Sequence, residues 1–335
     1  MTGRPGADVA VVGVGAWGSR HLAALVAMLG EERVAFYDAA ADRSAEAAAR
    51  YPTARGFASW EEFLASDVRA AVIAAPAAQH AELARAALRA GKDLLVEKPL
   101  ALAPAAAAAV VREAEKRGAV LMVGHILLFD PAFEALHGAA AAGELGAIKY
   151  VEAERAKLGT IRTAEDVLFS LAAHDVAAAL WLVGRPPLAV SSVGARVLGG
   201  ALADAASLNM TFEGGATAHL WASWLYPVPA RRFVVVGDAG MAVVEQRGRS
   251  ELTLYRRGGR MGADGPAVFD EGSRAVPASD ADSLRAELGH FLECVATRAT
   301  PRADGRQGLA VVKVLAAAQK SARAGGAPVR LEGDL

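Results

Sequence analysis

The sequence is poor in the features that mark secreted, membrane and nucleic-acid-binding proteins. It has a single cysteine, Cys294, so it forms no internal disulfide, which is typical of a reducing compartment. No apolar run reaches the roughly 18 residues of a membrane-spanning helix, and residues 1–8 hold no apolar signal core. A net charge of −1 gives no field that attracts nucleic acid or an anionic membrane surface. We therefore expect a cytoplasmic protein without nucleic-acid or membrane partners.

Two kinds of catalytic site are missing as well. No group of His, Cys or carboxylate residues has the spacing of metal ligands, so we predict no metal. No G-x-S-x-G elbow of a serine hydrolase is present. Cys294 lies within a helix-like pattern over residues 291–295, which favours a core residue over a nucleophile.

The N-terminal part of the chain alternates short apolar runs with helical patterns. With 335 residues, 53% apolar and 22% charged, the chain is globular and long enough for two domains. Buried strands are predicted at residues 9–12, 34–37, 70–74, 93–96 and 120–123, and helices at 17–29, 43–50, 79–90 and 104–117. This alternation predicts an α/β, doubly wound parallel sheet in a first domain over residues 1–124.

The second domain, over residues 125–335, has a different rhythm. Helices are predicted at 131–142, 164–182, 283–297 and 305–323, strands at 188–197, 205–212, 216–225, 232–236, 241–245 and 251–255, and a mobile loop at 256–278. The strands indicate a large, mostly antiparallel sheet. One face of it needs cover, and the apolar residues assigned to that face are Leu220, Trp224, Leu225, Val234, Val236 and Val243. This predicts face-to-face packing into a dimer or tetramer.

A glycine-rich turn follows the first strand. It reads Gly13-Val14-Gly15-Ala16-Trp17-Gly18 and fits G-x-G-x-x-G between a strand and a helix, which is the context of a dinucleotide-binding site. The glycines permit the tight turn, the approach of a pyrophosphate and the packing of helix on strand. Asp38 ends the second strand, where a carboxylate accepts both ribose hydroxyls and repels a 2′-phosphate. Asp38 favours NAD over NADP, whereas the nearby Arg43 argues in the opposite direction.

Other candidates for the cofactor edge follow later strands of the same sheet, because ligands bind at the carboxyl ends of such strands. These candidates are Ala75, Pro76, His80, Glu97, Lys98, Pro99 and His125. Lys98 fits a group that hydrogen-bonds a substrate hydroxyl and fits a surface lysine equally well. His80 is either a polar residue at a helix start or a cofactor contact, and His125 is either a cleft residue or a buried one.

His174 lies within the apolar helix predicted at 164–182. A core histidine is the commoner case, but a general base also needs a pKa near neutrality. Ser170 lies one helical turn before His174. Oxidation of an alcohol removes a hydroxyl proton together with a hydride, so a base and a polarising cation beside a nicotinamide are what that reaction requires.

These residues resemble the glucose–fructose oxidoreductase / inositol dehydrogenase / MocA family over nearly the full chain. The marks are Gly13–Gly18, Glu97–Pro99 and a histidine on the helix after Gly146. The resemblance implies an NAD-dependent dehydrogenase in which Lys98 and His174 flank the nicotinamide and the reacting hydroxyl.

Four segments resemble one branch of that family, namely Val120–Phe133, Gly143–Gly146, Leu158–Arg162 and Glu165–Asp175. This implies oxidation of the 3-hydroxyl of UDP-N-acetylglucosamine, or of its 6-carboxylate, to a 3-keto sugar nucleotide. The expected substrate-binding residues are Lys98, His125, Arg155, Arg162, Ser170 and His174. The two arginines would bind the 6-carboxylate, the diphosphate or neither.

Two alternatives stay open. One is a dehydrogenase or ketoreductase for another sugar, nucleotide sugar or inositol. The other is a non-catalytic regulator that senses NAD(H), although such a protein is expected to lack Lys98 or His174, and both are present.

Overall fold

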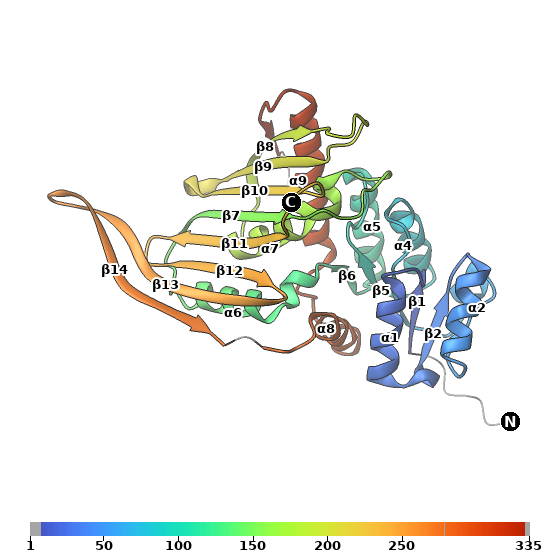
Figure 1. Cartoon of the computed structure of the whole chain (residues 1–335). Coiled ribbons are helices and arrows are strands. Elements are labelled where there is room, and N and C mark those ends of the chain that lie inside the picture. The colour runs from blue at the N-terminus through green and yellow to red at the C-terminus, as the bar shows by residue number, and fades with distance from the viewer. Residues whose placement is uncertain (1–7, 278, 332–335) are drawn as a thin grey trace. The chain divides into compact units, whose positions relative to one another are not determined.

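The computed structural model describes residues 8–277 and 279–331, which divide into two compact units. The first unit contains the described residues up to His125 together with Asp282–Val312. The second contains Ile126–Ala281 and the described residues from Lys313 onward. Figure 1 shows the course of the chain.

The first unit is built on a parallel six-stranded sheet with the order β3-β2-β1-β4-β5-β6. Its strands are β1 (Val9–Val12), β2 (Val34–Tyr37), β3 (Arg55–Gly56), β4 (Ala70–Ile73), β5 (Asp93–Glu97) and β6 (Leu121–Gly124). The residues of β1 and β4 are buried along their whole length, as expected when helices cover both faces of a parallel sheet. The predicted doubly wound fold is confirmed.

Helices alternate with these strands. They are α1 (Gly18–Leu29), α2 (Ala41–Arg50), α3 (Trp60–Ala65), α4 (His80–Arg89) and α5 (Pro104–Arg117). The signals that end them are local: α5 begins with Pro104 and ends at Gly118, which has the left-handed conformation of a helix C-cap. The sequence did not predict α3 or β3.

A segment from the C-terminal part of the chain completes the first unit. Helix α8 (Ser283–Thr297) packs against α1, and Arg298 places two guanidinium nitrogens 2.5 and 3.1 Å from the carboxylate of Asp93. The amide of Val123 donates to the carbonyl of Ala303 at 2.8 Å. A boundary drawn along the chain at residue 124 therefore differs from the compact units, because these contacts are distant in sequence.

The second unit contains a nine-stranded sheet with the order β14-β13-β12-β11-β7-β10-β9-β8-β15. Its strands are β7 (Ile148–Ala156), β8 (Pro187–Ala195), β9 (Ala205–Phe212), β10 (Thr217–Ser223), β11 (Ala230–Gly237), β12 (Met241–Arg247), β13 (Arg249–Gly262), β14 (Gly265–Val276) and β15 (Val329–Arg330). All the pairings are antiparallel except that of β7 with β10. The mostly antiparallel sheet is confirmed, although β7 near its centre was not predicted.

Helices α6 (Pro131–Ala141), α7 (Ala173–Val183) and α9 (Gly305–Arg323) complete the list of long helices, and both α6 and α7 contact the sheet. The rings of Phe133 on α6 and Phe233 on β11 meet edge to face, with centroids 5.2 Å apart.

Two residues assigned to the open face of the sheet were placed wrongly. Leu220 and Trp224 are buried, whereas Val234 alternates with the buried Phe233 and is only partly covered. The period-2 alternation within each strand decides the face.

Residues 256–278 were predicted as a mobile loop, and this is wrong for the described part. Strands β13 and β14 form a long hairpin in which Gly262 pairs with Gly265 around a two-residue turn. Figure 1 shows this hairpin extending beyond the neighbouring strands of its sheet. Glycine and charge content predicted a loop, but cross-strand pairing forms the hairpin. Residue 278 lies outside the described residues.

Candidate functional site

The glycine turn of the first unit has no room for side chains. Gly13 has φ +87°, and a Cβ there would lie 2.8 Å from the amide nitrogen of Ala75. A Cβ on Gly18 would lie 1.7 Å from the carbonyl oxygen of Gly13. Only glycine fits at either position, so the backbone between β1 and α1 forms a tight turn. No side chain of the described residues caps the first backbone amides of α1. This geometry fits the pyrophosphate of a dinucleotide.

Asp38 lies at the carboxyl end of β2, beside this turn. One carboxylate oxygen accepts the amide hydrogen of Val14 at 2.7 Å, and the other accepts that of Ala40 at 2.9 Å. The side chain is therefore fixed, while each oxygen keeps a lone pair for a ribose hydroxyl. Arg43 also approaches the turn, since a Cβ on Gly15 would lie 3.4 Å from its Nη1 atom.

His80 links two loops at the same edge of the sheet. It is buried, and its Nδ1 and Nε2 atoms lie 2.7 Å from the carbonyl oxygens of Pro99 and Ala75, respectively. Because backbone carbonyls engage both ring nitrogens, the structure gives His80 a loop-linking role. A direct cofactor contact by His80, Ala75 or Pro76 stays a prediction.

Glu97 connects the end of β5 to helix α1. Its Oε1 atom accepts a hydrogen bond from the indole of Trp17 and lies 2.8 Å from Nε2 of His21, and Oε2 accepts the amide hydrogen of Lys98 at 3.1 Å. Burial alone raises the pKa of this carboxyl. The hydrogen bond and charge of His21, the charge of Lys98 and the bond from Trp17 outweigh burial and lower the pKa below its usual range. Glu97 is thus an anion that fixes the turn carrying Lys98.

His125 directly follows β6, next to Glu97. The residue is 1% exposed, and neither ring nitrogen has a hydrogen-bond partner among the residues that the structure describes. Burial lowers the pKa of His125, the charge of Glu97 raises it and the charge of Lys98 lowers it, and together they lower the pKa to about 4. Gly124 pairs with Glu97, and a Cβ there would lie 3.1 Å from the carboxyl carbon of Glu97. The first unit therefore brings Glu97, Lys98 and a neutral His125 together at two adjacent strand ends.

In the second unit, His174 lies at the start of α7, directly after a π-helical turn over Leu168–Ala172. Ser170 lies inside this turn and is buried, whereas His174 is half-buried. The turn is wider than an α-turn, so the spacing that placed Ser170 on the same face one α-turn before His174 does not hold through it. Such turns are frequent at functional sites.

Arg155 on β7 pairs with Asp175, the neighbour of His174. Its Nε and Nη2 atoms donate to the two carboxylate oxygens of Asp175 at 2.7 and 2.8 Å, and both side chains are nearly buried. Burial lowers the pKa of Arg155, but the charge and hydrogen bonds of Asp175 and the charge of Asp130 raise it overall. Arg155 is thus a fixed cation that already has an anionic partner.

Arg231 is a second cation at this place, and the sequence reasoning missed it. It lies on β11 directly opposite Arg155 in the antiparallel register. Burial and the charge of Arg155 lower its pKa, and the charge of Asp175 raises it. One carboxylate therefore faces two guanidinium groups. The only sequence signal was an arginine on a strand, which does not reveal its cross-strand neighbour.

Arg162 lies in the loop between β7 and the π-turn. Its side chain is exposed, and it makes no ion pair with any residue that the structure describes. Its predicted substrate role stays a prediction.

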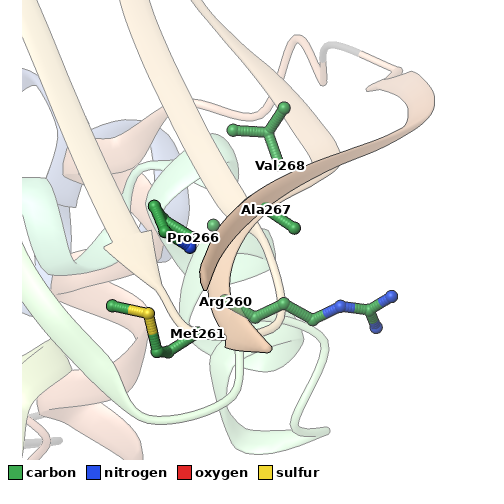
Figure 2. A pocket seen from close by; sticks show the side chains of 6 residues that line it. Arg260, Met261, Pro266, Ala267 and Val268 are labelled. Atoms are coloured by element: carbon green, nitrogen blue, oxygen red, sulfur yellow. The ribbon is translucent and has the colours of Figure 1, made fainter. Parts of the chain in front are cut away.

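A shallow hollow of about 350 Å³ lies elsewhere, on the β13–β14 hairpin (Figure 2). It is lined by Gly259, Arg260, Met261, Pro266, Ala267 and Val268. These residues include no general base and no carboxylate, so this hollow is not the candidate site.

The described residues contain no group of three or more His, Cys, Asp or Glu side chains arranged to hold a metal ion. No helix among them is long and apolar enough to cross a membrane. Cys294 is buried on α8, and burial followed by the charge of Glu293 raises the pKa of its thiol. That pKa shift disfavours the nucleophilic thiolate.

Comparisons with known proteins cover most of the chain. The sequence matches the oxidoreductase family with an NAD-binding Rossmann fold over residues 7–125, and the GFO/IDH/MocA C-terminal domain over residues 133–243. A UDP-N-acetylglucosamine 3-dehydrogenase of Acidithiobacillus ferrooxidans is 35% identical over 309 residues, which cover 92% of this chain and 94% of that protein.

Two further comparisons add to this. A solved structure of a UDP-N-acetylglucosamine 3-dehydrogenase from the same organism has a TM-score of 0.83 at 32% identity, covering 94% of this chain and 97% of that one. A myo-inositol dehydrogenase of Streptomyces leeuwenhoekii is 30% identical over 331 residues, which cover 96% of this chain and 99% of that protein.

Proposed function

Since this chain belongs to the glucose–fructose oxidoreductase / inositol dehydrogenase / MocA family of oxidoreductases, we propose that it oxidises the 3-hydroxyl of a UDP-N-acetylglucosamine-type sugar nucleotide. The observation that carries this proposal is the similarity to a UDP-N-acetylglucosamine 3-dehydrogenase over 92% of the chain. The substrate is UDP-N-acetylglucosamine or its 6-carboxylate, and the product is the 3-keto sugar nucleotide.

NAD⁺ supplies the hydride acceptor for this reaction. The residues of the first unit fit such a cofactor, because the glycine turn leaves room for a pyrophosphate and Asp38 presents fixed oxygens to a ribose diol. In the proposal, His174 accepts the proton of the 3-hydroxyl, and Lys98 donates a hydrogen bond to the same oxygen as negative charge develops there. Glu97 fixes the backbone of Lys98 for this task.

The neutral ring of His125 supports a polar contact with a bound ligand. A neutral imidazole offers one donor and one acceptor, which suits a sugar hydroxyl or an amide. Because both nitrogens are buried without a partner in the described part of the chain, such a contact would offset their desolvation cost.

We assign the anionic part of the substrate, its diphosphate or 6-carboxylate, to Arg231 rather than to Arg155. Arg155 donates two hydrogen bonds to Asp175, whereas Arg231 lies opposite and forms no ion pair within the described residues. Arg231→Met is expected to raise the KM for a UDP-sugar about tenfold or more, because a hydrogen bond to a charged group contributes about 1.5–3 kcal/mol. Arg256→Met, at an exposed arginine of the β13–β14 hairpin, provides the control. If the two variants have equal KM values, the assignment to Arg231 is wrong.

The alternative substrate class is a free sugar or inositol, and the 30% identity to a myo-inositol dehydrogenase favours it. A substrate panel read by NADH absorbance separates the two classes. It contains UDP-N-acetylglucosamine, its 6-carboxylate, UDP-glucose, glucose and myo-inositol, each with NAD⁺. The proposal requires a kcat/KM for one of the N-acetylated UDP-sugars at least about 100-fold above that for the free sugars, or about 2.7 kcal/mol. Faster turnover of inositol would replace the proposal. No turnover of any compound, with NADH still bound, would favour the regulator.

Two further properties complete the proposal. We propose that NAD(H) is preferred to NADP(H), for the reason given at Asp38, and that the protein is cytoplasmic. We also propose that the open face of the nine-stranded sheet joins two copies of the chain. Tyr150, Val234 and Val243 lie on this face and are all at least partly exposed. Light scattering at micromolar concentration tests the assembly: Val234→Glu is expected to give monomers, and a monomeric wild type would refute it.

A further inference from the structure

Helix α8 carries a glutamate that none of the proposed steps uses. Glu287 is 0% exposed, and neither of its carboxyl oxygens has a hydrogen-bond partner within residues 8–277 and 279–331. An ionised carboxylate in such a place would cost several kcal/mol without a cation or donors to offset it. The group therefore needs a proton, a partner or both.

Helix α1, which packs against α8, also carries a buried polar group with an atom unpartnered among the described residues. His21 is fully buried, and its Nε2 atom lies 2.8 Å from Glu97. Its Nδ1 atom has no hydrogen-bond partner in the described part of the chain. A protonated carboxyl group has both an O–H donor and a C=O acceptor, so it satisfies Nδ1 whichever tautomer His21 adopts.

The charges around Glu287 favour its neutral form. Burial raises the pKa of Glu287 well above its usual range, and the negative charge of Glu97 raises it further. The other charged groups of the two helices are Arg20 on α1 and Arg285 and Glu293 on α8, all exposed, together with the half-buried His290 on α8. The neighbouring charge that raises the pKa of Glu287 is that of Glu97. If Glu287 were ionised, it and Glu97 would place two negative charges in one buried cluster, and a proton on Glu287 avoids this.

We propose that Glu287 is a positioning residue that holds a proton and turns its carboxyl group to the Nδ1 atom of His21, a hydrogen bond that neither group makes in the structure as it stands, so that Glu97 is the only anion of the cluster Glu287–His21–Glu97 next to Lys98. This inference rests on the proposed function only where it concerns Lys98. This hydrogen-bonded cluster would hold Glu97 through Nε2 of His21, which approaches the same Oε1 atom as the indole of Trp17, and Glu97 in turn fixes the backbone of Lys98 through Oε2. A second charge in this cluster would draw the lysine ammonium away from the reacting hydroxyl.

Infrared spectroscopy of the purified protein tests the proton directly. The wild type at neutral pH is expected to show the C=O band of a buried protonated carboxylic acid, which shifts in D₂O. Glu287→Gln should lose this band, whereas Glu293→Gln, on the exposed side of the same helix, should keep it. A wild-type spectrum without the band, or a band that persists in Glu287→Gln, overturns the proposal. This measurement needs no substrate, so it stands even if the UDP-sugar assignment fails.

The pH dependence of unfolding provides a second test. A carboxyl whose pKa is raised on folding keeps a proton that the unfolded chain releases above about pH 4.3, so wild-type stability falls as pH rises past that value. Glu287→Gln does not titrate and escapes this loss. Its melting temperature is expected to exceed that of the wild type by a margin that grows from about pH 5 to about pH 8. A constant margin, or one that shrinks, contradicts the inference.

Activity tests the positioning role. Glu287→Leu keeps the volume but leaves Nδ1 of His21 without its partner, so kcat is expected to fall about tenfold, as for the loss of one buried hydrogen bond. The KM for NAD⁺ should stay within about twofold, and Glu287→Gln should recover most of the lost kcat because its amide also donates and accepts. Equal kcat values for the Leu and Gln variants would reduce Glu287 to a packing residue. Failure of every variant and of the wild type to turn over UDP-sugars would refute the proposed function instead.

Discussion

The ion pair between Arg155 and Asp175 yields a quantitative prediction about stability. The pair is bidentate, and only 11% of the Arg155 side chain and 4% of the Asp175 side chain are exposed. Asp175→Asn leaves the guanidinium buried without its counter-charge. Arg155 also lies opposite Arg231 in the strand register. Without the carboxylate of Asp175 between them, the two guanidinium groups repel each other.

Removing one partner of a buried pair typically costs about 3–5 kcal/mol, because the remaining charge is still desolvated. For a unit of this size, 1 kcal/mol corresponds to about 2–4 °C in the melting temperature. We therefore expect Asp175→Asn to lower the melting temperature by about 10 °C. In the double variant Arg155→Met/Asp175→Leu most of this loss should be recovered, since neither charge is left behind.

The hairpin offers a matched control for the assay. Arg257 and Asp270 approach to the same 2.7 Å, but they are 45% and 58% exposed. Asp270→Asn should leave the melting temperature almost unchanged, because exposed pairs contribute little. Differential scanning calorimetry of the single and double variants measures all of these effects. If Asp175→Asn costs no more than Asp270→Asn, water reaches Arg155 and the argument from burial fails.

The other predictions concern the cofactor, the chemistry and the acid limb of stability. NAD(H) should be used at least about tenfold better than NADP(H), and Asp38→Ala should erase most of that ratio in steady-state assays; an equal preference in the wild type would contradict the role of the carboxylate. Lys98→Ala and His174→Ala should each lower kcat at least about 100-fold. Both variants should still bind NADH, as measured by quenching of protein fluorescence. The double variant should be little worse, because both groups act on one oxygen, and a single variant with more than about a tenth of wild-type kcat would remove its residue from the mechanism. Because the pKa of His125 is lowered to about 4, wild-type stability should fall as pH drops from about 6.5 towards 4, by up to about 3 kcal/mol. His125→Gln should flatten this limb in urea titrations, and an unchanged limb would mean that another group titrates there.

The features that the sequence predicts well are those decided by neighbouring residues. The strand over Val9–Val12 and the helix over Pro104–Arg117 were predicted with the bounds that the structure gives them. The first depends on an uninterrupted apolar run, and the second on a proline at its start and a glycine after its end. The glycine turn belongs to the same class, because the conformation of Gly13 and the contact between Gly18 and Gly13 are local requirements.

The features that were missed depend on contacts distant in sequence. Strand β7 was not predicted because its charged residues, such as Glu152, occupy the open face, and its apolar positions become a pattern only when β10 and β11 pair with it. Arg231 acquires its significance from the register opposite Arg155. The buried Glu287 looks like an ordinary polar residue of an amphipathic helix until α8 packs against α1.

The helix and loop that return from the C-terminal part of the chain impose an order on biosynthesis. Asp93 is buried and relies on Arg298, and β6 relies on the backbone around Ala303, so the first unit lacks part of its interior until a ribosome has translated more than 300 codons. The nascent dinucleotide-binding half therefore stays incomplete while strands β7 to β14 of the second sheet are synthesised. A nonsense codon late in the gene would therefore damage the N-terminal half of the protein as severely as the C-terminal half, and expression of residues 1–124 alone should yield an aggregating polypeptide rather than a small NAD-binding module.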